Sequence, residues 1–68
     1  MPSRYEDRIY EILSSEPVTP GEVARRLGVN YKAAGDVLMH LALTRKDVRY
    51  KASRRINIFW RERVEDNV

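Results

Sequence analysis

The fold is decided by residues 19–43, which read TPGEVARRLGVNYKAAGDVLMHLAL. Thr19 can cap a helix that begins at Pro20, because proline at that position gives up an N–H that has no partner inside the helix. Glu22 lies three residues after the cap, which is the spacing of a capping box. Apolar residues then recur at helical intervals, so the sequence predicts a short helix over residues 20–27.

A second helix is predicted directly after the first. Gly28 can adopt the positive φ that ends a helix, and Asn30 can cap the next one. Apolar side chains then line one face of a helix over residues 31–44. They are Ala34, Val37, Leu38 and Leu41. Two short helices that cross steeply need a small residue where they touch, which Ala24 supplies, and glycine at the turn.

The chain before residue 19 predicts one more helix, over residues 4–14, with an apolar stripe on one face. The stripe consists of Tyr5, Ile9, Ile12 and Leu13. Tyr10 lies off this stripe and either packs in a dimer contact or is an exposed amphipathic ring; we favour packing. Val18 lies between two prolines in extended chain and can form a very short strand that pairs with the later hairpin.

After the predicted third helix, the apolar repeat changes to a period of two, which predicts a β-hairpin over residues 48–60. Val48, Tyr50 and Ala52 alternate with Arg49 and Lys51, and Ile56, Ile58 and Trp60 alternate with Asn57 and Phe59, around a turn at Ser53, Arg54 and Arg55. We expect Tyr50 and Trp60 to pack the sheet onto the first and third helices, with Phe59 on the opposite face. Residues 61–68 form a polar tail, either disordered or a short helix that helps the chain to dimerise.

The two capped helices, with Ala24 and Gly28 between them, resemble the helix-turn-helix of DNA-binding proteins. Together with the elements before and after them, they resemble the winged helix-turn-helix family over residues 4–61. The resemblance implies a single α+β domain, residues 1–68, in the order helix, strand, helix, helix, strand, strand. It also implies that the third helix enters the major groove of duplex DNA, while the hairpin, or wing, contacts the flanking backbone or minor groove.

The composition excludes several other classes of protein. The chain has no cysteine and one histidine, so we expect no disulfide and no metal site. Its three glycines form no phosphate-binding loop, and no acids are paired on a cleft, so we expect no enzyme, cofactor or small-molecule ligand. No apolar run approaches the roughly 18 residues that span a membrane, and residues 1–13 lack the pattern of a signal peptide. These features predict a cytoplasmic, nucleoid-associated protein.

Basic residues are concentrated near the end of the chain. Residues 45–63 hold eight of the thirteen basic residues and two of the ten acidic ones, although the net charge of the whole chain is only +3. Such a basic segment attracts a polyanion such as nucleic acid. The alternative is that these side chains only solvate a small hairpin.

The exposed face of the third helix supplies the first candidate DNA contacts. Asn30 can pair with adenine, although capping uses the same side chain. Lys32 can donate to guanine or to a phosphate, and Tyr31 can reach a phosphate or a thymine methyl group. Gly35 costs about 1 kcal/mol inside a helix, which indicates close approach of DNA or of the preceding helix. Asp36 either accepts from cytosine or pairs with Lys32, and we favour the pair.

The other candidate DNA contacts are all basic. They are Arg25 and Arg26 on the 20–27 helix, Arg49 and Lys51 on the outward face of the hairpin, and Arg54 and Arg55 at its tip. The pair on the helix can touch the DNA backbone where that helix crosses it. Arginine at a hairpin tip fits a narrow minor groove or phosphates.

The resemblance, together with the basic hairpin, implies a small transcriptional regulator of prokaryotic, archaeal or viral type that binds duplex DNA as a homodimer. Two other functions stay open. Asp36 and the apolar Met39 on the same helix face also fit a winged helix that binds another protein of the transcription or replication machinery. RNA or unusual DNA is a third possible ligand of the same fold.

Overall fold

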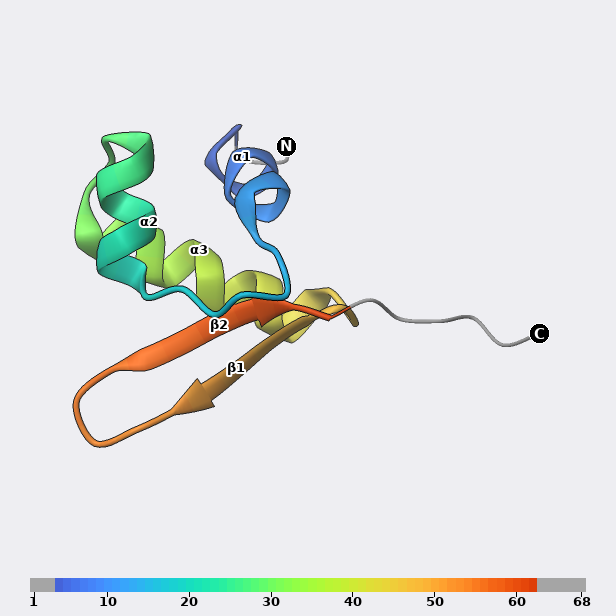
Figure 1. Ribbon diagram of the computed structural model, residues 1–68. Helices are drawn as coiled ribbons and strands as arrows, with labels where there is room; N and C mark the ends of the chain where they lie inside the picture. Colours follow the sequence, from blue (N-terminus) through green and yellow to red (C-terminus); the bar gives the residue numbers. More distant parts are fainter. Residues whose placement is uncertain (1–3, 63–68) are drawn as a thin grey trace.

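Three helices and a two-stranded antiparallel sheet build the part of the chain that the computed structural model describes, residues 4–62 (Figure 1). In chain order they are α1 (Arg4–Ile12), α2 (Pro20–Leu27), α3 (Tyr31–Thr44), β1 (Val48–Ala52) and β2 (Asn57–Arg61). The predicted bounds of α2 and α3 are confirmed, whereas α1 ends two residues before the predicted residue 14. The Leu13 N–H still donates to the carbonyl oxygens of Ile9 and Tyr10, after which the chain leaves the helix.

The ends of α2 and α3 are fixed by the residues that the sequence indicates. The Thr19 hydroxyl accepts from the Glu22 N–H at 3.2 Å, and the Glu22 carboxylate lies 3.3 Å from Arg26 Nη2. Gly28 has φ 66° and ψ 35°, and its N–H donates to the Ala24 carbonyl, which closes α2. Asn30 Oδ1 then caps α3. The turn between the helices is therefore specified by side-chain chemistry rather than by packing alone.

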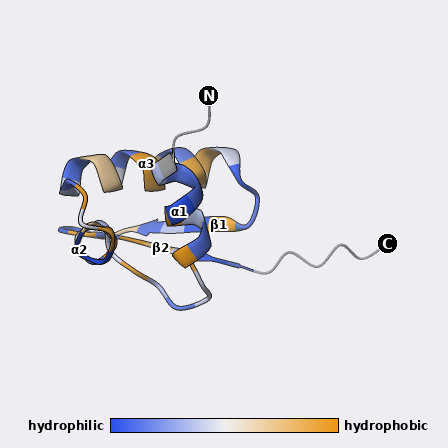
Figure 2. Ribbon diagram, turned by 90° about the horizontal axis from the view of Figure 1, so that it is seen from above, coloured by the Kyte–Doolittle hydropathy of each residue, from blue (hydrophilic) through white to orange (hydrophobic). Residues whose placement is uncertain are grey.

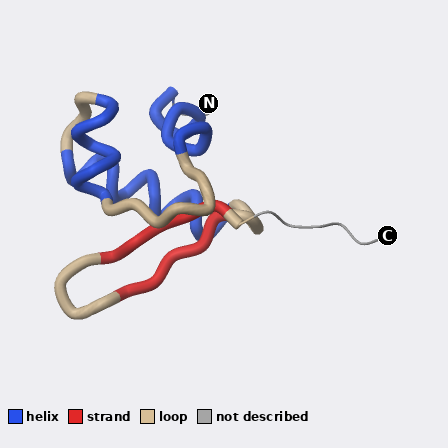
Figure 3. Tube along the Cα trace, viewed as in Figure 1, coloured by secondary structure: helices blue, strands red, loops and turns tan. Residues whose placement is uncertain are grey.

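The hairpin packs its inner face beneath the helices. In Figure 1 the three helices lie above the two strands, and the loop between the strands projects beyond them at the lower left; Figure 3 shows the same division of helix and strand. Ten apolar side chains are buried between these layers. They are Ile9, Leu13, Val18, Val23, Ala24, Ala34, Leu38, Leu41, Val48 and Phe59. Along the helices, apolar and polar segments alternate, as Figure 2 shows. The layout is compatible with that of a winged helix.

The short strand expected at Val18 is a single bridge. Val18 and Phe59 exchange two backbone hydrogen bonds, each of 2.8 Å, which attaches the chain before α2 to the edge of β2. Because the bridge is isolated, the sheet of the described chain has the order β1-β2. The bridge also holds Phe59 at the centre of the core.

The predicted inner face of the hairpin is right for β1 but wrong for β2. Phe59 is only 1% exposed and belongs to the core, whereas Tyr50 is 44% exposed and Trp60 is half-buried. The structure pairs Tyr50 with Phe59 and Arg49 with Trp60, so Tyr50 and Phe59 share the inner face. A turn of three residues at 53–55 would have paired Tyr50 with Ile58. The loop instead has four residues, and this shift of the register by one position exchanges the two faces of β2.

Tyr10 packs within the molecule. Its hydroxyl donates to Asp47 Oδ2 at 2.5 Å, and its ring lies between the guanidinium groups of Arg45 and Arg61, at 4.8 and 4.6 Å from the ring centre. We call these four residues the Tyr10 cluster. Arg61, assigned to the tail by its sequence, is the last residue of β2 and also donates to the Tyr10 carbonyl at 3.1 Å. The cluster joins α1 to both ends of the hairpin.

Candidate nucleic-acid interface

The exposed face of α3 lies opposite its buried stripe. Ala34, Leu38 and Leu41 are completely buried, which turns the other side of the helix to solvent. We call this side the α3 face. It consists of Tyr31, Lys32, Gly35, Asp36 and Met39, of which Gly35 and Met39 are half-buried and the others exposed. Tyr31 is 62% exposed, although it lies in the first turn of the helix. The structure thus leaves most of the predicted recognition residues open to a ligand.

Asn30 is committed to the cap of α3. Its Oδ1 atom accepts from the N–H groups of Lys32 and Ala33, at 2.8 and 3.4 Å. A bidentate pair with adenine needs both the oxygen and the nitrogen of an amide. The helix cap therefore occupies Oδ1, the oxygen that adenine recognition requires, and only the NH₂ group of Asn30 is left for a base or a phosphate.

The favoured pair between Lys32 and Asp36 does not form. Within residues 4–62, the ion pairs on the helices join Arg26 to Glu22 and His40 to Glu6, and no pair joins Lys32 to Asp36. Both side chains are exposed and extend from one side of α3. Exposed pairs at this spacing stabilise a helix by only about 0.3–0.5 kcal/mol, so solvent competes with them easily. A cation and an anion are thus both available for contacts with a ligand.

A notch of about 330 Å³ joins the α3 face to the hairpin. It is lined by Pro20, Tyr31, Lys32, Gly35, Asp36, Met39, Asn57 and Phe59. Asn57 is a lining residue that the sequence did not single out, because only the register of the strands places its side chain on the inner face beside α3. A Cβ atom added to Gly35 would lie 3.8 Å from Pro20 Cβ, an ordinary contact, so α2 approaches Gly35 without requiring glycine.

The hairpin loop, residues 53–56, carries unpaired positive charge. Arg54 and Arg55 are exposed, and neither has an ion-pair or hydrogen-bond partner among the residues that the structure describes. The loop is closed by the Ser53 N–H, which donates to the Ile56 carbonyl at 3.0 Å. Figure 1 places it on the side of the molecule where α3 begins. The hairpin loop and the start of α3 therefore lie on the same side of the molecule.

Arg49 and Lys51 lie on the other face of the sheet. The register pairs them with Trp60 and Ile58, on the side that faces away from the helices. Arg49 is also paired with Glu62, with 3.4 Å between Nε and Oε2. The structure therefore does not bring these two predicted contacts together with Lys32.

The arginines of α2 differ in their surroundings. Both are exposed, but Arg26 is paired with Glu22 of the preceding helical turn, whereas Arg25 has no ion-pair partner within residues 4–62. Arg25 is thus the freer of the two to meet a phosphate.

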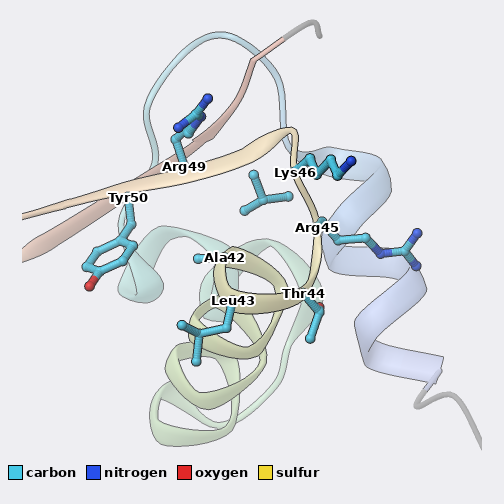
Figure 4. Close-up of a pocket in the computed structure, with 8 residues that line it drawn as sticks. Ala42, Leu43, Thr44, Arg45, Lys46, Arg49 and Tyr50 are labelled. Carbon is cyan, nitrogen blue, oxygen red and sulfur yellow. The ribbon is translucent and has the colours of Figure 1, made fainter.

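A second, larger groove of about 610 Å³ lies between the end of α3 and β1 (Figure 4). Its lining is Ala42, Leu43, Thr44, Arg45, Lys46, Val48, Arg49 and Tyr50. Leu43 is 75% exposed. In Figure 4 the Arg45 side chain extends toward α1, and Arg49 extends from the strand away from α3. Apolar and basic side chains therefore line this groove together.

Within residues 4–62, no three histidine, cysteine, aspartate or glutamate side chains are grouped closely enough to hold a metal ion. In the same residues, every helix is too short or too polar to traverse a lipid bilayer.

The sequence matches no protein-family model, and comparisons with curated proteins and with solved structures find no match either. A function for this chain therefore has to be inferred from the geometry and charge of its own surface.

Proposed function

We propose that this protein is a winged helix-turn-helix protein that binds duplex DNA and regulates transcription. The observation that carries the proposal is the notch that joins the open α3 face to the hairpin, with Arg54 and Arg55 unpaired at the tip of that hairpin. A major groove about 12 Å wide admits one α-helix. With α3 in that groove, the hairpin loop meets the flanking backbone or the minor groove.

The residues of the α3 face have distinct roles in such a complex. Lys32 donates to guanine acceptors or to a phosphate, and Asp36 accepts from the exocyclic amine of cytosine. Because Lys32 and Asp36 are not paired with each other, neither contact requires an existing ion pair to break. Tyr31 reaches a phosphate through its hydroxyl or packs on a thymine methyl group. Arg25 contacts the backbone where α2 crosses it.

The active unit is a homodimer. One domain of this size touches few base pairs, and a two-fold dimer doubles the number of contacts on a palindromic site. Selection of bound duplexes from a random pool is expected to give a palindrome. A motif without two-fold symmetry would contradict dimeric binding while leaving DNA recognition in place.

The experiment that tests DNA binding is a salt titration of duplex affinity with two single variants. Arg54→Ala removes a proposed phosphate contact and should lower the slope of log K against log salt by about 0.9. Arg8→Ala is the matched control, because Arg8 is an exposed arginine on α1, away from the hairpin loop. Its slope should equal that of the unmodified protein. The proposal would be contradicted if the protein did not bind duplex DNA at low salt, or if both variants lowered the salt slope equally.

A second candidate function is that of a protein-interaction module, which the exposed side chains of Leu43 and Tyr50 in the larger groove favour. Reversing the charges of Arg54 and Arg55 should then leave the biological function intact, whereas DNA binding predicts its loss. Duplex RNA tested as a competitor separates the remaining alternative, because an RNA-binding protein would prefer it to duplex DNA.

A further inference from the structure

Ile56 is exposed in the hairpin loop beside two arginines that are unpaired within the described chain. It is 46% exposed and directly follows Arg54 and Arg55 in the hairpin loop. The alternating pattern of the sequence assigns Ile56 to a strand with Ile58 and Trp60. The four-residue loop removes it from the strand instead and leaves it in solvent. Single exposed apolar residues are common on protein surfaces, so the position of Ile56 matters only because of what surrounds and holds it.

The backbone of Ile56 is held in place by Ser53. The Ser53 N–H and hydroxyl both donate to the Ile56 carbonyl, at 3.0 and 2.5 Å, and the Ile56 N–H lies 3.4 Å from Ser53 Oγ. These contacts hold both the N–H and the carbonyl group of Ile56, so its backbone is fixed in the loop with the side chain exposed to solvent.

The charge around Ile56 selects one kind of partner. The two arginines before it have no acidic partner within residues 4–62, and such a loop attracts phosphates. Contact with phosphates alone requires no aliphatic side chain. In the minor groove, an aliphatic side chain among arginines finds apolar surface only at the sugars and at the faces of stacked bases, because the thymine methyl group lies in the major groove. Proteins reach those faces by inserting isoleucine, leucine or similar side chains into the minor groove.

We infer that Ile56 is a wedge that enters the minor groove, partly unstacks one base step and bends the duplex, while Arg54 and Arg55 hold the walls of the groove. The inference depends on the proposed function, because it requires that the hairpin loop meets DNA. It adds a preference for certain DNA sequences that does not depend on direct contacts with base edges. Pyrimidine–purine steps such as TA unstack easily and A-tracts are stiff, so sites with a TA step beneath the loop are bound more tightly.

The test measures bending by energy transfer between dyes at the two ends of duplexes of about 25 base pairs. One duplex carries a central TA step and the other a central A-tract. The unmodified protein should bend the TA duplex by at least about 20° and bind it more tightly than the A-tract duplex. Ile56→Ser should bind both duplexes with an unchanged salt slope but leave them straight. Ile56→Leu keeps an aliphatic wedge and should restore the bend.

Leu43→Ser is the matched control, because it removes an exposed aliphatic side chain outside the proposed DNA surface and should leave the bend unchanged. Binding without a bend, or an equal bend with Ile56→Ser, would overturn the wedge but leave DNA binding intact. Failure of the unmodified protein to bind either duplex at low salt would overturn the proposed function as well. The two failures are therefore distinguishable.

Discussion

Tyr10 shows how one residue can hold distant parts of the chain together. Its side chain bonds to Asp47 before β1 and lies between arginines that follow α3 and end β2. The sequence indicated only that Tyr10 lies off the apolar stripe of α1. Its partners are 35 or more positions further along the chain, and no local pattern identifies contacts of that kind. The packing role favoured for Tyr10 is therefore fulfilled inside one molecule.

Removing the Tyr10 hydroxyl should measurably destabilise the protein. Tyr10→Phe keeps the ring between the two guanidinium groups but deletes the hydrogen bond to the Asp47 carboxylate. Hydrogen bonds to charged groups contribute about 1.5–3 kcal/mol, and we expect a loss near the lower limit because the site is only partly buried. Urea denaturation measures the free energy of unfolding. Tyr31→Phe is the control, because the Tyr31 ring is exposed, and a loss as large as that of Tyr10→Phe would contradict the assignment.

Stability should also fall at alkaline pH in a manner that depends on Tyr10. The hydrogen bond to Asp47 raises the pKa of Tyr10 above its usual value of 10.0. Burial and the negative charge of Asp47 raise this pKa further, whereas the positive charges of Arg61 and Arg45 lower it in part. The protonated tyrosine is therefore favoured by folding. Its contribution is complete below pH 10 and is lost as the pH rises through the raised pKa. Urea denaturation from pH 8 upward should show a smaller alkaline loss in Tyr10→Phe than in the unmodified protein; equal losses would contradict this prediction.

The helices and the hairpin differ in how far their sequences determine them. The bounds of α2 and α3 follow from Thr19, Gly28 and Asn30, whose roles depend on neighbours at most five residues away. The face of a strand depends instead on the length of the loop between strands. The loop has a fourth residue because Ser53 forms a hydrogen bond with Ile56. The sequence contains no asparagine–glycine pair that would have predicted the type of turn. Arg54 and Arg55 nonetheless lie in this loop, as their sequence position indicates.

Two glycines should respond in opposite ways to the same substitution. Gly28 has positive φ, so Gly28→Ala should destabilise the protein by about 1–2 kcal/mol. Gly35 is inside α3 with an ordinary contact to Pro20, so Gly35→Ala should stabilise it by about 0.5–1 kcal/mol. Thermal unfolding distinguishes the two variants. A destabilised Gly35→Ala protein would show that α2 packs more closely against α3 than the structure indicates.

Gly35→Ala also tests why glycine occupies the α3 face. If DNA approaches this residue closely, the variant should be more stable yet bind duplex DNA more weakly. Unchanged affinity would show that the backbone of Gly35 is not near the duplex, and the contacts of α3 would then be limited to its longer side chains.

In the molecule as a whole, the apolar core and the charged side chains occupy different regions. The buried side chains lie between the helices and the inner face of the hairpin, whereas cations without an ion pair lie on the surface of the described chain, among them Lys32, Arg25 and the two arginines of the hairpin loop. The sequence predicted the concentration of positive charge near the hairpin and the outward position of Arg49 and Lys51, but it did not predict that this face lies away from the side of the molecule that displays Lys32. That separation depends on which face of the sheet the helices cover.

The most direct test is the change in backbone amide NMR signals when a short DNA duplex is added to the isotopically labelled protein. We expect the largest shifts in two segments, at the start of α3 from residue 30 to 36 and in the hairpin from residue 53 to 57, with α1 unaffected. Shifts confined to α1 or to the groove beside Leu43, or no shifts at low salt, would contradict the proposal that α3 and the hairpin loop grip one duplex.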